Sequence, residues 1–186
     1  GLGAKVVVTE TDPIRAIEAV MDGYEVMPLR DAAKMGEIFC SVTGCKDVMN
    51  AEHFALMRDG AILSNAGHFN VEIDMDALEK LAVRKYEARH NITGYVMPDG
   101  RELFVLGEGR LVNLACGDGH PAEIMDMSFA IQALSAEYLA RHAGTLERAP
   151  MSVPREIDDA VARRKLASLG VEIDSMTREQ KDYMGI

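Results

Sequence analysis

The stretch Lys5-Val6-Val7-Val8-Thr9-Glu10-Thr11-Asp12-Pro13 decides how this chain folds. Its three consecutive valines are typical of a short buried strand, which we predict over residues 5–9. Asp12 and Pro13 mark a helix start, because the carboxylate caps free backbone N–H groups and proline suits the first helical position. The helix is predicted to end at Gly23, so a strand leads directly into a helix.

The same alternation continues along the chain. Strands are predicted over residues 24–27, 38–42 and 61–64, with helices over residues 31–36 and 51–57 between them. Strict strand–helix alternation with short connections implies a parallel sheet with helices on both faces. Because crossovers between parallel strands are right-handed, the predicted fold is α/β, a doubly wound, Rossmann-like sheet. Beyond it, residues 75–83 have a helical pattern, and a hairpin turn is predicted at residues 98–100.

Composition excludes several classes of protein. The 186 residues carry a formal charge of −10 without a Lys/Arg-rich block, which argues against nucleic acid or a membrane surface as a partner. Cys40, Cys45 and Cys116 form no CxxC pair, and their odd number argues against a disulfide framework. Thiols of this kind favour a cytoplasmic location. Residues 1–10 lack the pattern of a secretory signal, and the apolar stretches are too short for a membrane span.

Glu10 follows the first predicted strand directly. In a dinucleotide-binding fold, an acidic residue at the end of the second strand accepts hydrogen bonds from the adenosine ribose hydroxyls. Its charge also repels a 2′-phosphate, so NAD is favoured over NADP. The alternative is that Glu10 is simply a solvated residue at a strand end.

This interpretation of Glu10 requires a phosphate-binding loop that the chain does not contain. A glycine-rich fingerprint normally lies about 20 residues before the acidic residue, but only nine residues precede Glu10. The run Gly1-Leu2-Gly3-Ala4 is instead typical of the end of a helix that turns into a strand. We therefore expect the sheet to lack its first βα unit, which would lie upstream of Gly1.

Two later loops also carry candidate binding residues. Asn65-Ala66-Gly67-His68-Phe69 follows the fourth strand, where loops of parallel sheets form the ligand crevice. Gly67 allows the backbone to approach a ligand closely, and His68 offers a donor or a general base. The alternative is a solvated histidine in a turn.

The second loop runs from Gly107 to Pro121 and is rich in glycine. It precedes a long helix, whose start favours negative charge, and its exposed backbone amides suit a bound ligand. A turn without a ligand is the alternative. Cys116 and His120 lack the partners that a metal site or a nucleophile needs, so we predict no metal.

The last part of the chain is predicted to be a helical arm. A long helix over residues 121–142 precedes a linker, and two more helices begin at Pro154 and Thr177. Helices that follow a linker are typical of an arm that packs elsewhere, such as on a partner subunit. We place an NAD-binding domain at residues 1–144, and the linker and arm at residues 145–186.

Several motifs in this order resemble the S-adenosylhomocysteine hydrolase family. The matching runs are Val7-Val8-Thr9-Glu10-Thr11-Asp12-Pro13, Thr43-Gly44-Cys45-Lys46-Asp47, Asn65-Ala66-Gly67-His68-Phe69, Glu72-Ile73-Asp74, Glu108-Gly109-Arg110-Leu111-Val112-Asn113-Leu114, Gly119-His120-Pro121 and Leu166-Ala167-Ser168-Leu169-Gly170. The resemblance covers essentially the whole chain. It implies reversible cleavage of S-adenosylhomocysteine to adenosine and homocysteine. The steps implied are oxidation of the ribose 3′-hydroxyl by NAD+, elimination of homocysteine, addition of water and re-reduction.

The resemblance also implies roles for particular residues. The implied NAD-binding residues are Glu10, Ala66, Gly67, His68, Asn113 and His120. Glu10 binds the adenosine ribose in this scheme, and Asn113 contacts the nicotinamide amide. The implied substrate-binding residues are His68, Leu114 and His120. A homo-oligomer, either a dimer or a tetramer, is implied by the way the family's arm reaches a neighbouring subunit.

The chain departs from the family pattern in several places. Ala66 replaces a bulkier aliphatic residue, and the loop at residues 116–119 differs from the common version. The family's catalytic Lys, Asp and substrate-binding carboxylates belong to an upstream domain, so no catalytic residue is expected in this chain. The Lys- and Tyr-containing tail of many members is also absent after Ile186. We therefore expect the chain alone to be inactive and to bind NAD weakly.

Two other functions remain open from the sequence. One is the cofactor domain of a 2-hydroxyacid dehydrogenase, although the Arg and acidic residue expected ahead of a catalytic His are not recognised here. The other is a non-catalytic NAD-binding module. The choice between adenosyl and inosyl substrates is also open.

Overall fold

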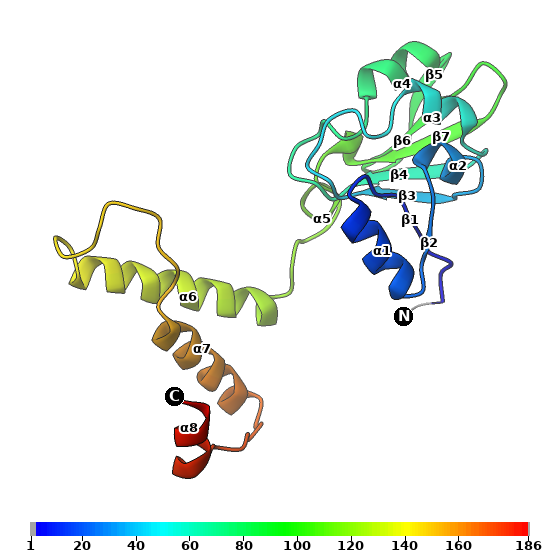
Figure 1. Ribbon diagram of the computed structural model, residues 1–186. Helices are drawn as coiled ribbons and strands as arrows, with labels where there is room; N and C mark the ends of the chain where they lie inside the picture. The colour runs from blue at the N-terminus through cyan, green and yellow to red at the C-terminus, as the bar shows by residue number, and fades with distance from the viewer. Residues whose placement is uncertain (1–2, 186) are drawn as a thin grey trace. The chain divides into compact units, whose positions relative to one another are not determined.

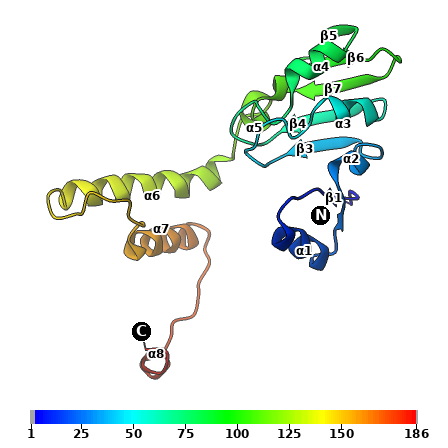
Figure 2. The ribbon, with the colours of Figure 1, turned by 45° about the horizontal axis from the view of Figure 1, so that its top comes forward.

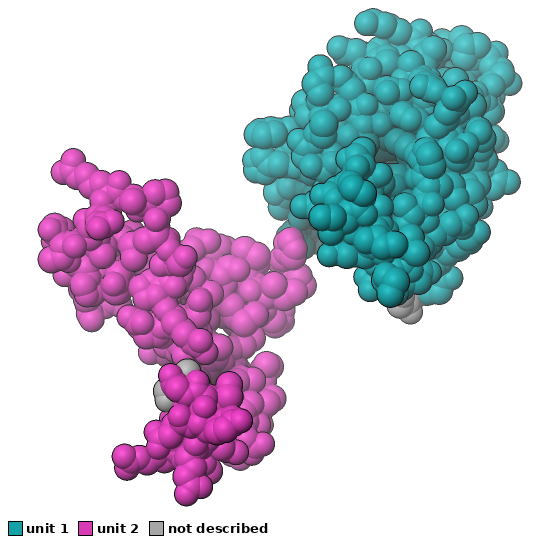
Figure 3. All heavy atoms as spheres, in the orientation of Figure 1, with its two compact units in different colours: residues 1–119 teal, residues 120–186 magenta. Residues whose placement is uncertain are grey.

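The computed structural model describes residues 3–185, which fall into two compact units divided after Gly119 (Figure 3). The division precedes the predicted domain boundary at residue 144. The reason is that helix α6 (Ala122–Arg141) packs against helix α7 (Arg155–Ser168) of the arm. A functional boundary at residue 144 stays a prediction.

The first unit alternates strands and helices, as Figure 1 shows. Its elements, in chain order, are β1 (Val7–Val8), α1 (Pro13–Met21), β2 (Glu25–Val26), α2 (Leu29–Ala32), β3 (Ile38–Ser41), α3 (Ala51–Leu56), β4 (Ala61–Asn65), α4 (Met75–Leu81), β5 (Arg84–Arg89), β6 (Ile92–Val96), β7 (Glu102–Leu106), the 3-10 turn η1 (Gly107–Gly109) and α5 (Val112–Ala115). The predicted alternation from residue 5 to residue 64 is confirmed, with differences of a few residues at the element ends.

The start of α1 confirms the prediction made from Asp12 and Pro13. The Asp12 Oδ1 atom accepts a hydrogen bond of 2.8 Å from the backbone N–H of Ile14, and Pro13 is the first helical residue. Gly23 has a φ of +88°, a left-handed conformation that suits glycine and ends the helix. Local sequence is sufficient to set both ends of this element.

The strands form two sheets. The strand order is β1-β2 in the first sheet and β3-β4-β7-β6-β5 in the second. The pairs β1–β2, β3–β4 and β4–β7 are parallel. Strands β5, β6 and β7 form an antiparallel meander. The mixed α/β architecture is thus Rossmann-like: the parallel pairing predicted from the alternation up to residue 64 is confirmed, and the predicted hairpin at residues 98–100 joins the antiparallel pair β6–β7. Short hairpins connect these strands, and a parallel pair needs a longer crossover.

The two hairpins of the meander have turns of different residue types. The predicted turn at Pro98-Asp99-Gly100 is confirmed, because the Gly100 N–H donates to the Met97 carbonyl at 2.9 Å. The sequence interpretation missed the second turn, in which Asn91 has a φ of 60°. Asparagine tolerates this left-handed conformation better than most residues.

The core lies on one face of the five-stranded sheet. The strand register places Phe39, Leu63, Val105, Leu103 and Tyr95 on that face, and all five are buried. Helices α2, α3 and α4 pack against them, and Figure 2 shows α3 and α4 on the same side of the strands. Burying one such side chain contributes about 1.5–3 kcal/mol.

The opposite face of the sheet is more exposed at its β3 edge than at its centre, where Ser64 is buried and Ile62 and Phe104 are half-buried. Ile38 on β3 is 71% exposed, and α1 contributes no buried residue. Within the described residues, the helices that pack on the five-stranded sheet lie on the core face, and helical cover of the second face stays a prediction. Strands β1 and β3 are not bonded to each other, so the sheet is interrupted between them.

The second unit is helical throughout its regular structure. Helix α7 buries Ile157 and Val161, and its Lys165 Nζ atom lies 2.8 Å from Asp126 Oδ2 on α6. The last helix, α8 (Arg178–Met184), begins with the predicted Thr177–Gln180 capping box. None of the helices in residues 3–185 is both long and apolar enough to cross a membrane.

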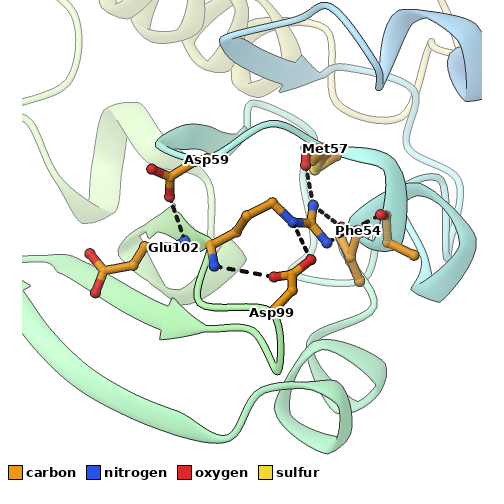
Figure 4. Close-up of polar contacts among 7 residues, drawn as sticks. Phe54, Met57, Asp59, Asp99 and Glu102 are labelled. Carbon is orange, nitrogen blue, oxygen red and sulfur yellow. Dashed lines mark hydrogen bonds and ion pairs between the residues drawn. The ribbon is translucent and has the colours of Figure 1, made fainter.

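Arg101 ties the β6–β7 hairpin to the end of α3 through hydrogen bonds, and Figure 4 shows its partners Met57 and Asp99. Its guanidinium donates hydrogen bonds to the carbonyl oxygens of Met57 and, at 3.2 Å, of Ala55. Its Nε atom donates to Asp99 Oδ2 at 2.7 Å, which fixes the side chain's direction. The last carbonyls of a helix have no partner within the helix, so Arg101 caps α3 from a distant part of the chain.

We expect Arg101→Met to lower the free energy of unfolding by about 1–3 kcal/mol, because the capped carbonyls lose their charged donor. Urea unfolding of the chain, followed by circular dichroism, measures this change.

The control is Arg30→Met, which removes a salt bridge of 3.2 Å to Glu52 between exposed side chains. Exposed ion pairs contribute about 0–1 kcal/mol, so this variant should unfold close to the unmodified chain. Equal losses in the two variants would contradict a capping role for Arg101.

Candidate functional site

Three loops meet at the carboxyl-terminal edge of the parallel strands. They follow β3, β4 and β7, and cover residues 42–47, 66–70 and 107–111. The backbone continues the β3–β4 pairing into them, since the Ala66 N–H donates to the Ser41 carbonyl at 2.8 Å. Because loops at this edge form the ligand crevice of open α/β sheets, this is the candidate site.

Asn65, the last residue of β4, connects the end of β3 with the second and third loops through its side chain. The Oδ1 atom accepts hydrogen bonds from the Gly67 N–H at 2.6 Å and from the Ser41 hydroxyl at 3.4 Å. The Nδ2 atom donates to the carbonyls of Phe69 at 2.7 Å and Gly109 at 2.9 Å. The side chain is fully buried, and these four bonds satisfy its two donors and two acceptor sites.

Glu72 connects the first loop to the second. Its Oε2 atom accepts hydrogen bonds from the Thr43 N–H at 2.9 Å and the Thr43 hydroxyl at 2.8 Å. Its Oε1 atom accepts from the Gly44 N–H at 2.6 Å. Glu72 is fully buried, so its carboxylate is an interior anion held by the backbone of another loop.

Two opposing effects set the pKa of Glu72. Burial raises it, but the N–H groups of Thr43 and Gly44, with the hydroxyls of Thr43 and Ser41, hold the pKa below its ordinary value. The carboxylate is therefore ionised at neutral pH. Its stabilising contribution is present above the pKa of the unfolded chain and is lost as the pH falls through the lower folded-state pKa.

Gly67 is glycine for a reason that differs from the one expected. A Cβ atom added there would overlap Glu72 Oε1, and would lie 2.7 Å from the Glu72 carboxyl carbon and 3.0 Å from Asn65 Oδ1. Gly67 is not among the glycines with positive φ, so backbone strain does not demand it. The structure thus explains Gly67 by the close approach of two buried side chains.

The third loop wraps the start of α5. Glu108 has a φ of 55°, and Gly107 and Gly109 beside it also have positive φ. The backbone of Leu111 pairs with that of Asn65 in an isolated parallel bridge. This bridge and the Asn65–Gly109 hydrogen bond bring the third loop beside the second.

The predicted site residues of the second and third loops lie at this edge. Ala66 and His68 are exposed, and the His68 ring meets the Phe69 ring edge-on with centroids 4.5 Å apart. Asn113 on α5 is half-buried, whereas Leu114 is 66% exposed. The loops therefore present backbone groups, an imidazole and an amide, a set suited to binding a polar ligand.

Glu10 and His120 belong to other parts of the structure than the second and third loops, and their roles stay predictions. Glu10 follows β1 in the separate two-stranded sheet, and His120 begins the second unit. The exposed Glu10 carboxylate accepts hydrogen bonds through Oε1 from the N–H groups of Thr11 at 2.6 Å and Asp12 at 3.0 Å. The N–H of Asp12 and then that of Thr11 lower the pKa of Glu10, which keeps it anionic.

The sequence interpretation missed the residues that join the loops. It assigned no role to Asn65, Glu72 or Thr43, although all three lie within the motifs that carry the resemblance. One available signal was Glu72, a charged residue immediately before the buried Ile73. A buried carboxylate needs hydrogen-bond partners, and the neighbouring loop supplies them.

Comparison with known proteins supports the resemblance. Residues 1–119 match the family model described as S-adenosyl-L-homocysteine hydrolase, NAD binding domain. The adenosylhomocysteinases of Aquifex aeolicus and Thermococcus kodakarensis are 58% and 60% identical over 184 residues, which are 99% of this chain and 44% of each relative. The S-inosyl-L-homocysteine hydrolase of Methanosarcina acetivorans is 58% identical over the same shares.

The chain thus spans less than half the length of these relatives. The matches favour the family that the motifs resemble over a 2-hydroxyacid dehydrogenase or a separate NAD-binding module. With a family model over 119 residues and relatives of this similarity, the chain belongs to the S-adenosyl-L-homocysteine hydrolase family and contains residues of its NAD-binding domain.

Proposed function

We propose that this chain provides the NAD site of an enzyme that reversibly cleaves S-adenosylhomocysteine to adenosine and homocysteine. The observation that carries the proposal is the joining of three loops at the carboxyl edge by Asn65 and Glu72. The joined loops lie inside the segment that matches the NAD-binding family model. When bound, NAD supplies the oxidation of the ribose 3′-hydroxyl and its later reversal.

The available polar groups fit this cofactor. Glu10 is anionic, and its Oε2 atom makes no hydrogen bond within the described residues, so it is free to accept from ribose hydroxyls. We assign exposed Ala66, buried Gly67 and half-buried Asn113 to the nicotinamide side. His68 and Leu114 are exposed, and we assign them, together with His120, to the substrate.

The interrupted sheet favours a missing parallel strand between β1 and β3. In the six-stranded dinucleotide-binding order, the first strand lies between the second and the fourth. β1 and β2 match the second and third strands of that order, and β3, β4 and β7 match the fourth to sixth. The first βα unit, with its phosphate-binding loop, then covers the open edges, and a separate segment provides the catalytic Lys and Asp.

The assembled enzyme is, in this proposal, a cytoplasmic homo-oligomer whose helical arm packs on a neighbouring subunit. Two observations support an arm of this kind. Helix α6 has no buried residue, and its Phe129 is 58% exposed. The substrate is an adenosyl or inosyl derivative of homocysteine, and relatives of both names match this chain equally well.

For the complete gene product that contains these residues, we expect Glu10→Gln to weaken NAD binding about tenfold, since a charged hydrogen-bond acceptor is lost. The preference for NAD over NADP should also narrow, because the charge that repels a 2′-phosphate is gone. Calorimetric titrations with both cofactors measure the two effects. Glu87→Gln, on the exposed edge strand β5, is the matched control, and unchanged NAD affinity in Glu10→Gln would contradict the assignment.

We expect the isolated 186-residue chain to cleave no S-adenosylhomocysteine, even with added NAD, because the phosphate-binding loop and the catalytic groups are supplied by other segments. Release of homocysteine, followed with a thiol reagent, is the measurement. Substrate turnover by the isolated chain would overturn this division of the site.

A further inference from the structure

Glu72 is a buried anion that holds the first loop of the proposed site, and the proposed function assigns it no contact with cofactor or substrate. Its side chain is fully buried, and no Lys, Arg or His within residues 3–185 forms an ion pair with it. An isolated interior charge is costly, and proteins retain one only when hydrogen bonds compensate. Here the compensation comes from two backbone N–H groups and one hydroxyl of the loop after β3.

The backbone around Glu72 is anchored independently of its side chain. The Glu72 carbonyl accepts from the Met49 N–H at 3.0 Å, and the Val71 carbonyl accepts from the Asp47 N–H at 2.8 Å. Met49 and Ile73 also pair as an isolated parallel bridge. The carboxylate is therefore presented from a fixed segment, and the loop at Thr43 and Gly44 is fixed by it in turn.

The Glu72 carboxylate also limits how closely the loop after β4 can approach it. Gly67 passes so close to Glu72 that no Cβ fits between them, and its N–H is held by Asn65 Oδ1 at 2.6 Å. Two of the three loops at the candidate site are thus placed by the same carboxylate, one through hydrogen bonds and the other through contact.

The donors around Glu72 require a partner that only accepts. Both Thr43 and Gly44 present N–H groups to it, and the two carboxylate oxygens are both used. A glutamine side chain of the same shape would direct an NH₂ group at one of these donors, because it has only one acceptor atom. The position of the loop at Thr43 and Gly44 therefore depends on the negative charge of Glu72.

We propose that Glu72 is a positioning residue for cofactor binding, which holds the loops at residues 43–45 and 66–68 in the spacing that the nicotinamide side of NAD requires. The inference rests on the proposed function and adds to it a residue that does not touch the ligand. Preformed loops lose less conformational freedom on binding, so the effect is measured as cofactor affinity.

The test compares Glu72→Gln with the surface control Glu87→Gln in the complete gene product. We expect the Thr43 and Gly44 amides to exchange with deuterium at least about tenfold faster in Glu72→Gln, and the NAD dissociation constant to rise about tenfold. Amides of the core strands, such as Leu63 and Val105, should keep their exchange rates.

Two results would overturn the proposal. One is unchanged exchange and NAD affinity in Glu72→Gln. The other is a loss of protection that extends through β4 and β7, which would make Glu72 a general stability residue. Failure of the unmodified protein to bind NAD is a separate result, which refutes the proposed function, while exchange at Thr43 and Gly44 still decides whether Glu72 holds the loop.

A second pair of variants tests the contact with Gly67. Gly67→Ala should weaken NAD binding about tenfold or more, because the added Cβ overlaps Glu72 and displaces the loop. With Glu72→Ala already present, the same substitution should cost less than about threefold, since the obstructing carboxylate is gone. Equal losses in the two backgrounds would show that Glu72 does not set the position of Gly67.

Discussion

The side-chain amide of Asn65 is the interaction on which the candidate site depends. It is buried at the end of β4, and its four hydrogen bonds reach the end of β3, its own loop and the turn after β7. A buried polar group left unpaired costs about 1–3 kcal/mol, so each bond constrains the others. The three loops consequently form one polar network, in which a shift of any loop leaves a buried donor or acceptor without a partner.

Glu72 extends this network to the loop at Thr43 and Gly44 without introducing a counter-ion. Burying a carboxylate costs free energy of desolvation. The same carboxylate accepts hydrogen bonds from several backbone donors at once, which a neutral side chain does not. The same arrangement explains why residue 67 is glycine. What the sequence presents as one motif, Asn65 to Phe69, is therefore shaped by a residue outside that motif.

Local chemistry made much of the fold predictable. Asp12 with Pro13, Thr177 with Gln180, and the Pro98-Asp99-Gly100 turn act through neighbours a few residues away, and the structure confirms all three. The antiparallel pairing of β5 with β6 was not predicted, because the turn at Asn91 that joins them was not recognised in the sequence. Which face of the sheet the helices cover likewise depends on how all the elements pack together.

The residues of the candidate site likewise differ in whether the local sequence is sufficient to predict them. Ala66, His68 and Asn113 were identified because motif and strand position suffice to locate them, whereas the roles of Asn65 and Glu72 emerge only from partners 24 to 44 residues away. Glu10 shows a further limit, since its position after β1 was predicted but its distance from the other loops depends on the unfilled interval between β1 and β3.

In the proposed enzyme the cofactor is regenerated in each turnover, so a site that holds NAD through rigid loops avoids ordering them in every cycle. A polar network buried beneath those loops provides that rigidity while leaving the exposed backbone, imidazole and amide groups free for the ligand.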